Sequence, residues 1–273
     1  MTTKSTSHAV ATVAWEQRGL ERDAVARLEA TKSILRSTVG AVQREVVVVF
    51  PAGWFGSGND GPDDLIDWVE GEVAKLVEGY KNRVAVTLGV DGQRTEHGTL
   101  DQLAFAITSN GIVGAGRKFF SASDERPNLA PSWRDGEGDQ SRIVTLFGKR
   151  YYLAVCYDVF GIKKLGDANA GVDAVLVHVH GFAPKGEPGS GEGLFARHGF
   201  AGASQAWGVP VFGSVTFHNR PVPATWPSGV RWAGPPASTM TWSYSKNALS
   251  PSQVITVPCG AGKANVRVFL PWG

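Results

Sequence analysis

The stretch VVVVFPAGWF, residues 46–55, constrains the fold of this chain more than any other. Four consecutive valines and a phenylalanine have no polar side chain on either face, which is typical of a parallel strand covered on both sides. The Pro-Ala-Gly that follows must leave the sheet. In open α/β sheets, ligands bind beyond the carboxyl ends of the strands. Position 52 is therefore well placed for chemistry, yet Ala52 carries only a methyl group.

Composition narrows the class of protein. The chain has 273 residues, 42% of them hydrophobic, which is enough for one large core, so we expect a single domain over 1–273 with a Pro/Gly/Trp-rich C-terminal region from about residue 221. A net charge of +2 without a dense basic run argues against nucleic-acid partners. Two distant cysteines predict neither a disulfide framework nor a zinc site. Without a run of 18 apolar residues we expect no membrane association and a cytoplasmic protein.

The pattern along the chain is that of a mixed α/β sheet. Helical periodicity is expected at 20–39, 65–80 and 195–208. Apolar runs bounded by turn residues predict strands at 8–16, within 46–55, at 82–92, 171–182 and 209–218, as pairs within 100–120 and 142–161, and at 254–260 and 265–271. Because parallel crossovers alternate with hairpins, the sheet should contain both parallel and antiparallel pairs.

Two side chains have the chemistry of a catalyst. Cys156, in YYLAVCYDVFG, follows an apolar strand and precedes a bend, where a nucleophile can be presented at the edge of a sheet. The competing interpretation is a small buried hydrophobe, which a lone cysteine after Leu-Ala-Val usually is. A thiolate needs positive charge nearby, and Lys118 in GAGRKFF would supply it, although a lysine by itself is more often solvated at the surface.

Taken in order, VVVFPAGW, GRKFF and AVCYDVFG resemble the motifs of the nitrilase superfamily of carbon-nitrogen hydrolases, over about residues 8–220. The resemblance implies an α/β fold, a four-layer αββα sandwich of two mixed sheets flanked by helices. It implies Cys156 as nucleophile, with Lys118 and the backbone N–H of Tyr157 stabilising the oxyanion. Glu125 would orient Lys118, with Asp124 as the runner-up.

The resemblance also places the general base of the family at position 52, where this chain has Ala52. Two explanations are open. One is a deliberate substitution that holds an active enzyme inactive, and the other is a natural member that lost its base and kept the fold. Another carboxylate could replace the missing one, and Asp158, Glu137 and Glu192 are the candidates, although spacing favours none of them.

The function implied by the resemblance is hydrolysis of non-peptide C–N bonds through a thioester acyl-enzyme, without a cofactor and impaired by the missing base. The substrate would be a small amide, nitrile or carbamoyl compound, and by analogy with the family we expect a homo-oligomer. The alternative from another class is a nonenzymatic nitrilase-like binding or assembly protein.

Further residues have two interpretations. His178 and His180 lie two apart on a predicted strand and face one side, so a metal-dependent hydrolase is a lesser alternative. We expect instead that His180 lines the substrate pocket. The aromatic side chains expected to shape an apolar pocket with it are Trp54, Phe55 and Phe182.

Overall fold

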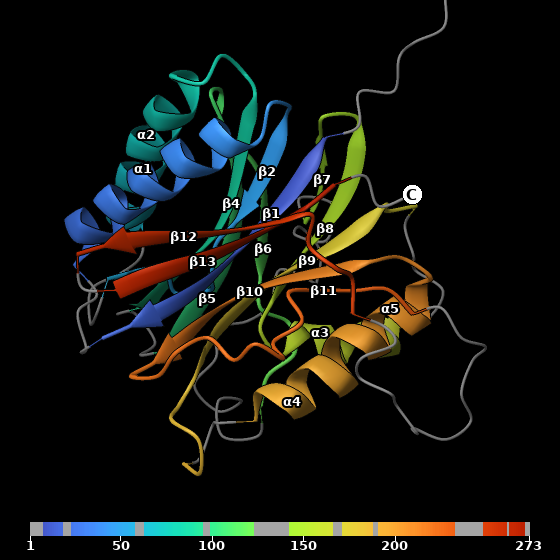
Figure 1. The fold of residues 1–273 in the computed structure, drawn as a ribbon. Coiled ribbons are helices and arrows are strands. Elements are labelled where there is room, and N and C mark those ends of the chain that lie inside the picture. Colours follow the sequence, from blue (N-terminus) through green and yellow to red (C-terminus); the bar gives the residue numbers. More distant parts are fainter. Residues whose placement is uncertain are drawn as a thin grey trace, which may run out of the picture.

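The structure is a computed structural model. It describes residues 8–18, 23–57, 63–94, 99–122, 142–165, 171–187, 191–232, 248–260 and 262–270. Within these ranges the chain forms one hydrogen-bonded sheet with helices on two sides (Figure 1). None of the helices described there is long and apolar enough to cross a bilayer.

The elements follow the predicted order. The strands are β1 (Ala9–Gln17), β2 (Val46–Val49), β3 (Phe55–Gly56), β4 (Val84–Arg94), β5 (Thr99–Thr108), β6 (Gly111–Arg117), β7 (Ile143–Leu146), β8 (Lys149–Val155), β9 (Ala174–Phe182), β10 (Val211–His218), β11 (Gly229–Val230), β12 (Gln253–Cys259) and β13 (Gly262–Phe269). The helical segments are α1 (Ala24–Ala41), α2 (Asp63–Glu78), α3 (Asp158–Gly161), α4 (Glu192–Leu194) and α5 (Ala201–Trp207), with a 3₁₀ turn η3 (Ile162–Leu165) and a π-helical segment η4 (Phe195–Phe200). The helix expected over 195–208 is thus η4 followed by α5.

The sheet is mixed, as predicted. Its strand order is β6-β5-β4-β2-β1-β10-β9-β8-β7. The central strands β4, β2, β1, β10, β9 and β8 pair in parallel, whereas β5 and β6 at one end and β7 at the other join by antiparallel hairpins. The hairpin of β12 and β13 is attached to β1.

The sheet folds over on itself, so that β5 and β6 pack against β8. Helices α1 and α2 cover one outer face and α3, α4 and α5 cover the other (Figure 1). The alternation along β2 shows both interfaces, because Val46 and Val48 pack in the core under α1 and α2, whereas Val47 and Val49 pack between the two halves of the sheet. The predicted four layers are therefore present.

The two sheets that were expected are one continuous sheet, because β1 changes partner along its length. Residues 9–12 pair with β2 and residues 14–17 pair with β10. At the change, the hydroxyl of Ser214 accepts a hydrogen bond from the N–H of Val13 at 3.0 Å and donates one to the carbonyl oxygen of Val49. Ser214 is fully buried. We call this place, where Ser214 joins β1, β2 and β10, the seam.

Candidate active site

Cys156 lies in a tight turn between β8 and α3. Its φ of +49° is in the left-handed region, which a side chain other than glycine rarely adopts. A nucleophile on a sharp strand-to-helix turn has this kind of strained backbone. The backbone N–H of Cys156 donates to the carbonyl oxygen of His178 at 2.7 Å, which attaches the turn to β9. We call residues 155–158 the elbow.

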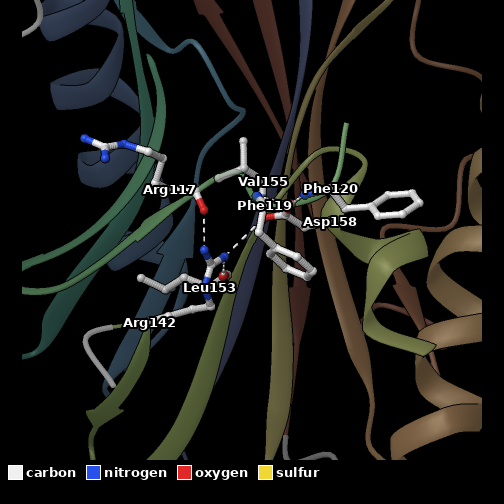
Figure 2. A network of polar contacts seen from close by, with 7 residues as sticks. All are labelled: Arg117, Phe119, Phe120, Arg142, Leu153, Val155 and Asp158. Carbon is white, nitrogen blue, oxygen red and sulfur yellow. Dashed lines mark hydrogen bonds and ion pairs between the residues drawn. The ribbon is translucent and has the colours of Figure 1, made fainter. Parts of the chain in front are cut away.

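The carboxylate of Asp158 holds the elbow against the segment that follows β6 (Figure 2). One oxygen, Oδ2, accepts from the N–H of Val155 at 3.0 Å. The other, Oδ1, accepts from the N–H groups of Phe119 and Phe120, both at 2.8 Å. Since Phe119 follows Lys118, one buried side chain fixes the positions of both the cysteine and the lysine.

Arg142 completes this network and is itself almost fully buried. Its Nη1 lies 3.1 Å from Oδ2 of Asp158 and donates to the carbonyl oxygen of Leu153 at 3.1 Å. Its Nη2 donates to the carbonyl oxygen of Arg117, as Figure 2 shows. Burial raises the pKa of Asp158, and the Arg142 charge and the backbone donors act against that rise.

These contacts correct one expectation from the sequence. The carboxylate of Asp158 is fully buried and occupied by three backbone donors and Arg142, so it cannot act as a replacement base. Glu192 forms an ion pair with Arg220 at 3.0 Å. Glu137 lies outside the described residues.

Lys118 follows β6 and is fully buried. Its Nζ lies 5.7 Å from the centre of the Tyr157 ring, and its charge acts on the thiol of Cys156. The structure therefore brings the predicted lysine, the cysteine and Tyr157 together. The residues expected to orient the lysine, Glu125 and Asp124, lie outside the described residues.

His180 is the titratable group that acts most strongly on Cys156. Burial raises the pKa of the Cys156 thiol, but a hydrogen bond from the His180 side chain, the charges of His180 and Lys118, and the backbone N–H of His180 lower it, with a lowered pKa as the net result. On its other side, Nε2 of His180 lies 2.9 Å from Oδ2 of Asp91. Burial lowers the pKa of His180, and the charges of Asp91 and Cys156, together with the close side-chain contacts to both, outweigh this and raise it to about 10.

Asp91 was not among the residues that the sequence predicted for the site. It lies towards the end of β4, in the half of the sheet opposite to His180. Its position in the sequence could have indicated a site residue. Asp91 is a carboxylate just past the apolar part of a central parallel strand, and such positions border the ligand-binding edge of a sheet. What the sequence did not reveal is that β4 and β9 bring their ends together.

His178 has a different environment from His180, and the pairing of β9 with β10 shifts its register between His178 and Gly181. Its Nδ1 donates to the carbonyl oxygen of Phe50 at 2.7 Å, and burial lowers its pKa to about 4, so the ring is neutral near pH 7. Among the described residues, no group of three or more His, Cys, Asp or Glu side chains is arranged to hold a metal ion. That part of the chain therefore lends no support to the metal-dependent alternative.

Position 52 adjoins the His180–Asp91 pair. Ala52 is buried in the same packing cluster as Cys156, and its N–H donates to the carbonyl oxygen of Val179 at 3.3 Å. The next residue, Gly53, has a φ of +55°, and a Cβ there would lie 2.7 Å from Oδ2 of Asp91 and 3.4 Å from the His180 ring.

Of the aromatic residues expected at the pocket, the structure places one near the elbow. The ring of Phe182 lies 5.7 Å from that of Phe195, which in turn lies 5.7 Å from Tyr157. Trp54 and Phe55 point the other way, into the core under α1 and α2. Both follow Gly53, whose φ of +55° turns the backbone just before them.

A hollow of about 320 Å³ lies elsewhere, between α1 and the ends of β1 and β12. Arg27 in its wall stacks over Trp15 and donates to Gln17 at 2.8 Å. The thiol in this hollow belongs to Cys259, and burial raises its pKa to about 11. A thiol that remains protonated near pH 7 is a poor nucleophile, so this hollow lacks the chemistry found around Cys156.

Comparison by sequence alone gives no assignment, since no family model matches the chain and no curated protein matches it either. Comparison of structures finds proteins that share the fold. A mutant of the amidase from Nesterenkonia sp. AN1, with the acetamide moiety of fluoroacetamide added covalently at its active site cysteine, superimposes with a TM-score of 0.56. The two chains are 14% identical, over 99% of this chain and 93% of that one.

Two further structures share the fold. A carbon-nitrogen hydrolase from Helicobacter pylori G27 matches with a TM-score of 0.57 and 14% identity, over 77% of this chain and 74% of that one. A CN-hydrolase superfamily protein from Xanthomonas campestris, with an arsenic adduct in its active site, matches with a TM-score of 0.54 and 16% identity, over 76% and 75%. At such identities the likeness concerns the fold, which is that of nitrilase-superfamily amidases.

Proposed function

We propose that this chain is a nitrilase-superfamily protein and a cysteine-dependent hydrolase of non-peptide C–N bonds, with Cys156 as its nucleophile. The observation that carries the proposal is the elbow, where Cys156 has a strained backbone beside the buried Lys118. A buried lysine that faces a thiol with a lowered pKa is not the solvated surface lysine of the alternative interpretation. Covalent modification of the active site cysteine in the amidase that shares the fold agrees with this role.

The chemistry follows from the thiolate. Its sulfur attacks the carbonyl carbon of an amide and forms a C–S bond, and the tetrahedral oxyanion is stabilised by Lys118 and the backbone N–H of Tyr157. The C–N bond then breaks, ammonia or an amine leaves, and water hydrolyses the thioester. Glu125 is proposed to orient Lys118. Amides, nitriles and carbamoyl compounds all fit these groups, and the amidase neighbours make small amides the first class to test.

The competing proposal is a binding or assembly protein without turnover, and Ala52 is the observation that favours it. Removal of a general base typically slows an enzyme by about 10²- to 10⁴-fold. If no other group acts on Cys156, this chain is impaired, either by a deliberate substitution or by natural loss. We also propose that the chain forms a homo-oligomer, which light scattering would test. We further propose a single domain over 1–273 and a cytoplasmic location.

The test is ammonia release from a panel of small amides, nitriles and carbamoyl compounds. It should be run on the unmodified chain, on Ala52→Glu, which restores the base of the family, and on both chains with Cys156→Ser. Turnover by Ala52→Glu that Cys156→Ser abolishes is the expected result. If Ala52→Glu folds and every compound stays intact, the hydrolase proposal fails and the binding protein becomes the better account.

A further inference from the structure

Three side chains from three strands converge where the general base is missing. Cys156 follows β8, and His180 lies near the end of β9. These two strands are parallel neighbours, and Val155 of β8 is paired with His178 of β9. Asp91 reaches the same place from β4, in the other half of the sheet. The order in space is a thiol, an imidazole and a carboxylate, which is the arrangement that activates cysteine nucleophiles on unrelated folds.

The contact between His180 and Asp91 is close and incompletely buried. Nε2 of His180 lies 2.9 Å from Oδ2 of Asp91, and the side chains are 25% and 19% exposed. The contact is an ion pair without the alignment of a good hydrogen bond, and catalytic contacts often tighten only when substrate binds. The other carboxylate oxygen, Oδ1, is buried and has no hydrogen-bond partner among the described residues, so nothing described there draws the carboxylate away from His180.

We propose that His180, oriented by Asp91, is the general base for Cys156 and takes the place of the carboxylate missing at position 52. The inference rests on the proposed function, because a base needs the hydrolytic reaction to act in. It also changes one expectation: the unmodified chain should hydrolyse its substrate even without the Ala52→Glu substitution.

The proton can be followed through each step of the reaction. Nε2 faces Asp91, so Nδ1 of His180 takes the proton from the Cys156 thiol, and the thiolate attacks the amide carbon. When the C–N bond breaks, His180 returns that proton to the leaving nitrogen, which departs as ammonia. His180 next takes a proton from water as the hydroxyl attacks the thioester, and the departing Cys156 sulfur receives it. The sum is amide plus water giving acid plus ammonia.

The charges around His180 agree with this role. Asp91 and Cys156 stabilise its protonated form, whereas burial acts against it. Lys118 faces the thiol from the end of β6, and the neutral His178 lies two residues away on the same strand. These groups favour a thiolate beside an imidazolium, the state in which Cys156 can attack and His180 can donate to the leaving group.

The backbone explains why the carboxylate base and the histidine are alternatives. Ala52 packs in the same cluster as Cys156, and a Cβ built at the adjacent Gly53 would meet both Asp91 and His180. A glutamate at position 52 would therefore extend into the neighbourhood that His180 occupies. The short side chain of Ala52 leaves that space to the imidazole.

The first experiment measures the thiol and not turnover. In a Cys259→Ala background, which leaves Cys156 as the single thiol, alkylation by iodoacetamide is followed by intact mass between pH 5 and 10. With His180 present we expect the rate to reach its plateau well below pH 8.5, the ordinary pKa of a thiol. His180→Gln should slow alkylation at pH 6.5 by about 10- to 100-fold and move the profile towards that of an ordinary thiol. A profile that His180→Gln leaves unchanged overturns the proposal.

The second experiment measures turnover of the amides that the panel identifies. His180→Gln and Asp91→Asn should each lower kcat by about 10²- to 10⁴-fold, whereas His198→Gln, a histidine on η4 outside the proposed site, should leave it unchanged. Adding Ala52→Glu to His180→Gln should recover part of the lost rate. Circular dichroism and thermal unfolding identify any variant that fails to fold, and its conservative partner, His180→Asn or Asp91→Glu, then replaces it.

The outcomes separate this inference from the proposed function. If Cys156-dependent ammonia release persists in His180→Gln at the unmodified rate, the hydrolase stands and the base assignment is overturned. If no compound is hydrolysed even by Ala52→Glu, but His180→Gln still shifts the alkylation profile, the hydrolase fails while the activation of Cys156 by His180 holds. If neither turnover nor the profile depends on His180, both are overturned.

Discussion

At Gly53, the addition of a single methyl group should disturb the proposed site. It has a positive φ, and a Cβ there would lie 2.7 Å from Oδ2 of Asp91. Gly53→Ala should push the carboxylate away from His180 and slow the alkylation of Cys156 at pH 6.5 by about tenfold, because the imidazolium that supports the thiolate is weakened.

Gly148→Ala is the matched control for this substitution. Gly148 also has a positive φ, of +75°, but a Cβ there would meet nothing within 4 Å. Both variants carry the same kind of backbone strain, and only Gly53→Ala carries the clash. Equal alkylation rates in the two variants would show that the position of Asp91 has no influence on the thiol.

At this scale, the sequence could point to candidate residues where local context marks their chemistry. Cys156 and Lys118 follow apolar strands, and the structure places them together. His180 was predicted beside the site, as a pocket residue and not as a base. Asp91 could not be predicted, because its contact with His180 joins strands that are far apart in the chain. Trp54 and Phe55, which the sequence placed beside the pocket, lie in the core under α1 and α2.

At the scale of elements, the elbow depends on the buried pair of Asp158 and Arg142. Asp158→Asn should lower the free energy of unfolding by about 3 kcal/mol or more, because it leaves the buried Arg142 without its counter-charge and places an amide donor among backbone donors. Urea unfolding measures this loss. Asp173→Asn is the control, since Asp173 pairs with Lys149 near the surface, where such a change costs at most about 1 kcal/mol. Similar losses in the two variants would contradict a supporting role of Asp158 at the elbow.

One hydroxyl links the two halves of the sheet at the seam, in addition to the backbone pairing of β1 with β2 and β10. Ser214→Ala would leave the N–H of Val13 and the carbonyl oxygen of Val49 buried without this partner, so we expect it to lower the free energy of unfolding by about 1–3 kcal/mol. Ser228→Ala is the matched control, because the Ser228 hydroxyl is equally buried and has no partner among the described residues. If denaturant unfolding shows equal losses for both, the seam does not depend on Ser214.

The helices and strands could be predicted from the sequence because their signals are local. The four valines of β2 and the apolar periodicity of α2 are properties of neighbouring residues. The seam gave no such signal, because Ser214 reads as one small polar residue in an apolar strand. The sequence suggested two sheets, and the change of partner along β1 that joins them is set by contacts between distant segments.

For the whole molecule, the pH dependence of stability should show an acid limb from His178. Its pKa is about 4 in the folded chain and near 6.5 when unfolded, so between these values the unfolded chain binds a proton that the folded chain does not. Stability therefore falls as the pH falls through this window, by about 3 kcal/mol from this residue, and His8, whose pKa is also lowered by burial, adds to the fall. Urea midpoints at pH 7 and pH 4.5 measure the slope. His178→Gln should flatten it, and an unchanged slope would assign the acid limb to other groups.

The proposed catalytic groups are divided between the two halves of the folded sheet. Lys118, Asp91 and Ala52 belong to strands on one side of the seam, and Cys156 and His180 belong to strands on the other. The half that holds Cys156 and His180 lacks Lys118 and Asp91. A chain in which only that half has folded would thus hold the thiol beside an imidazole without the two charges that support them. Full reactivity of Cys156 would then report on completed folding, appearing during refolding only when the two halves of the sheet have come together.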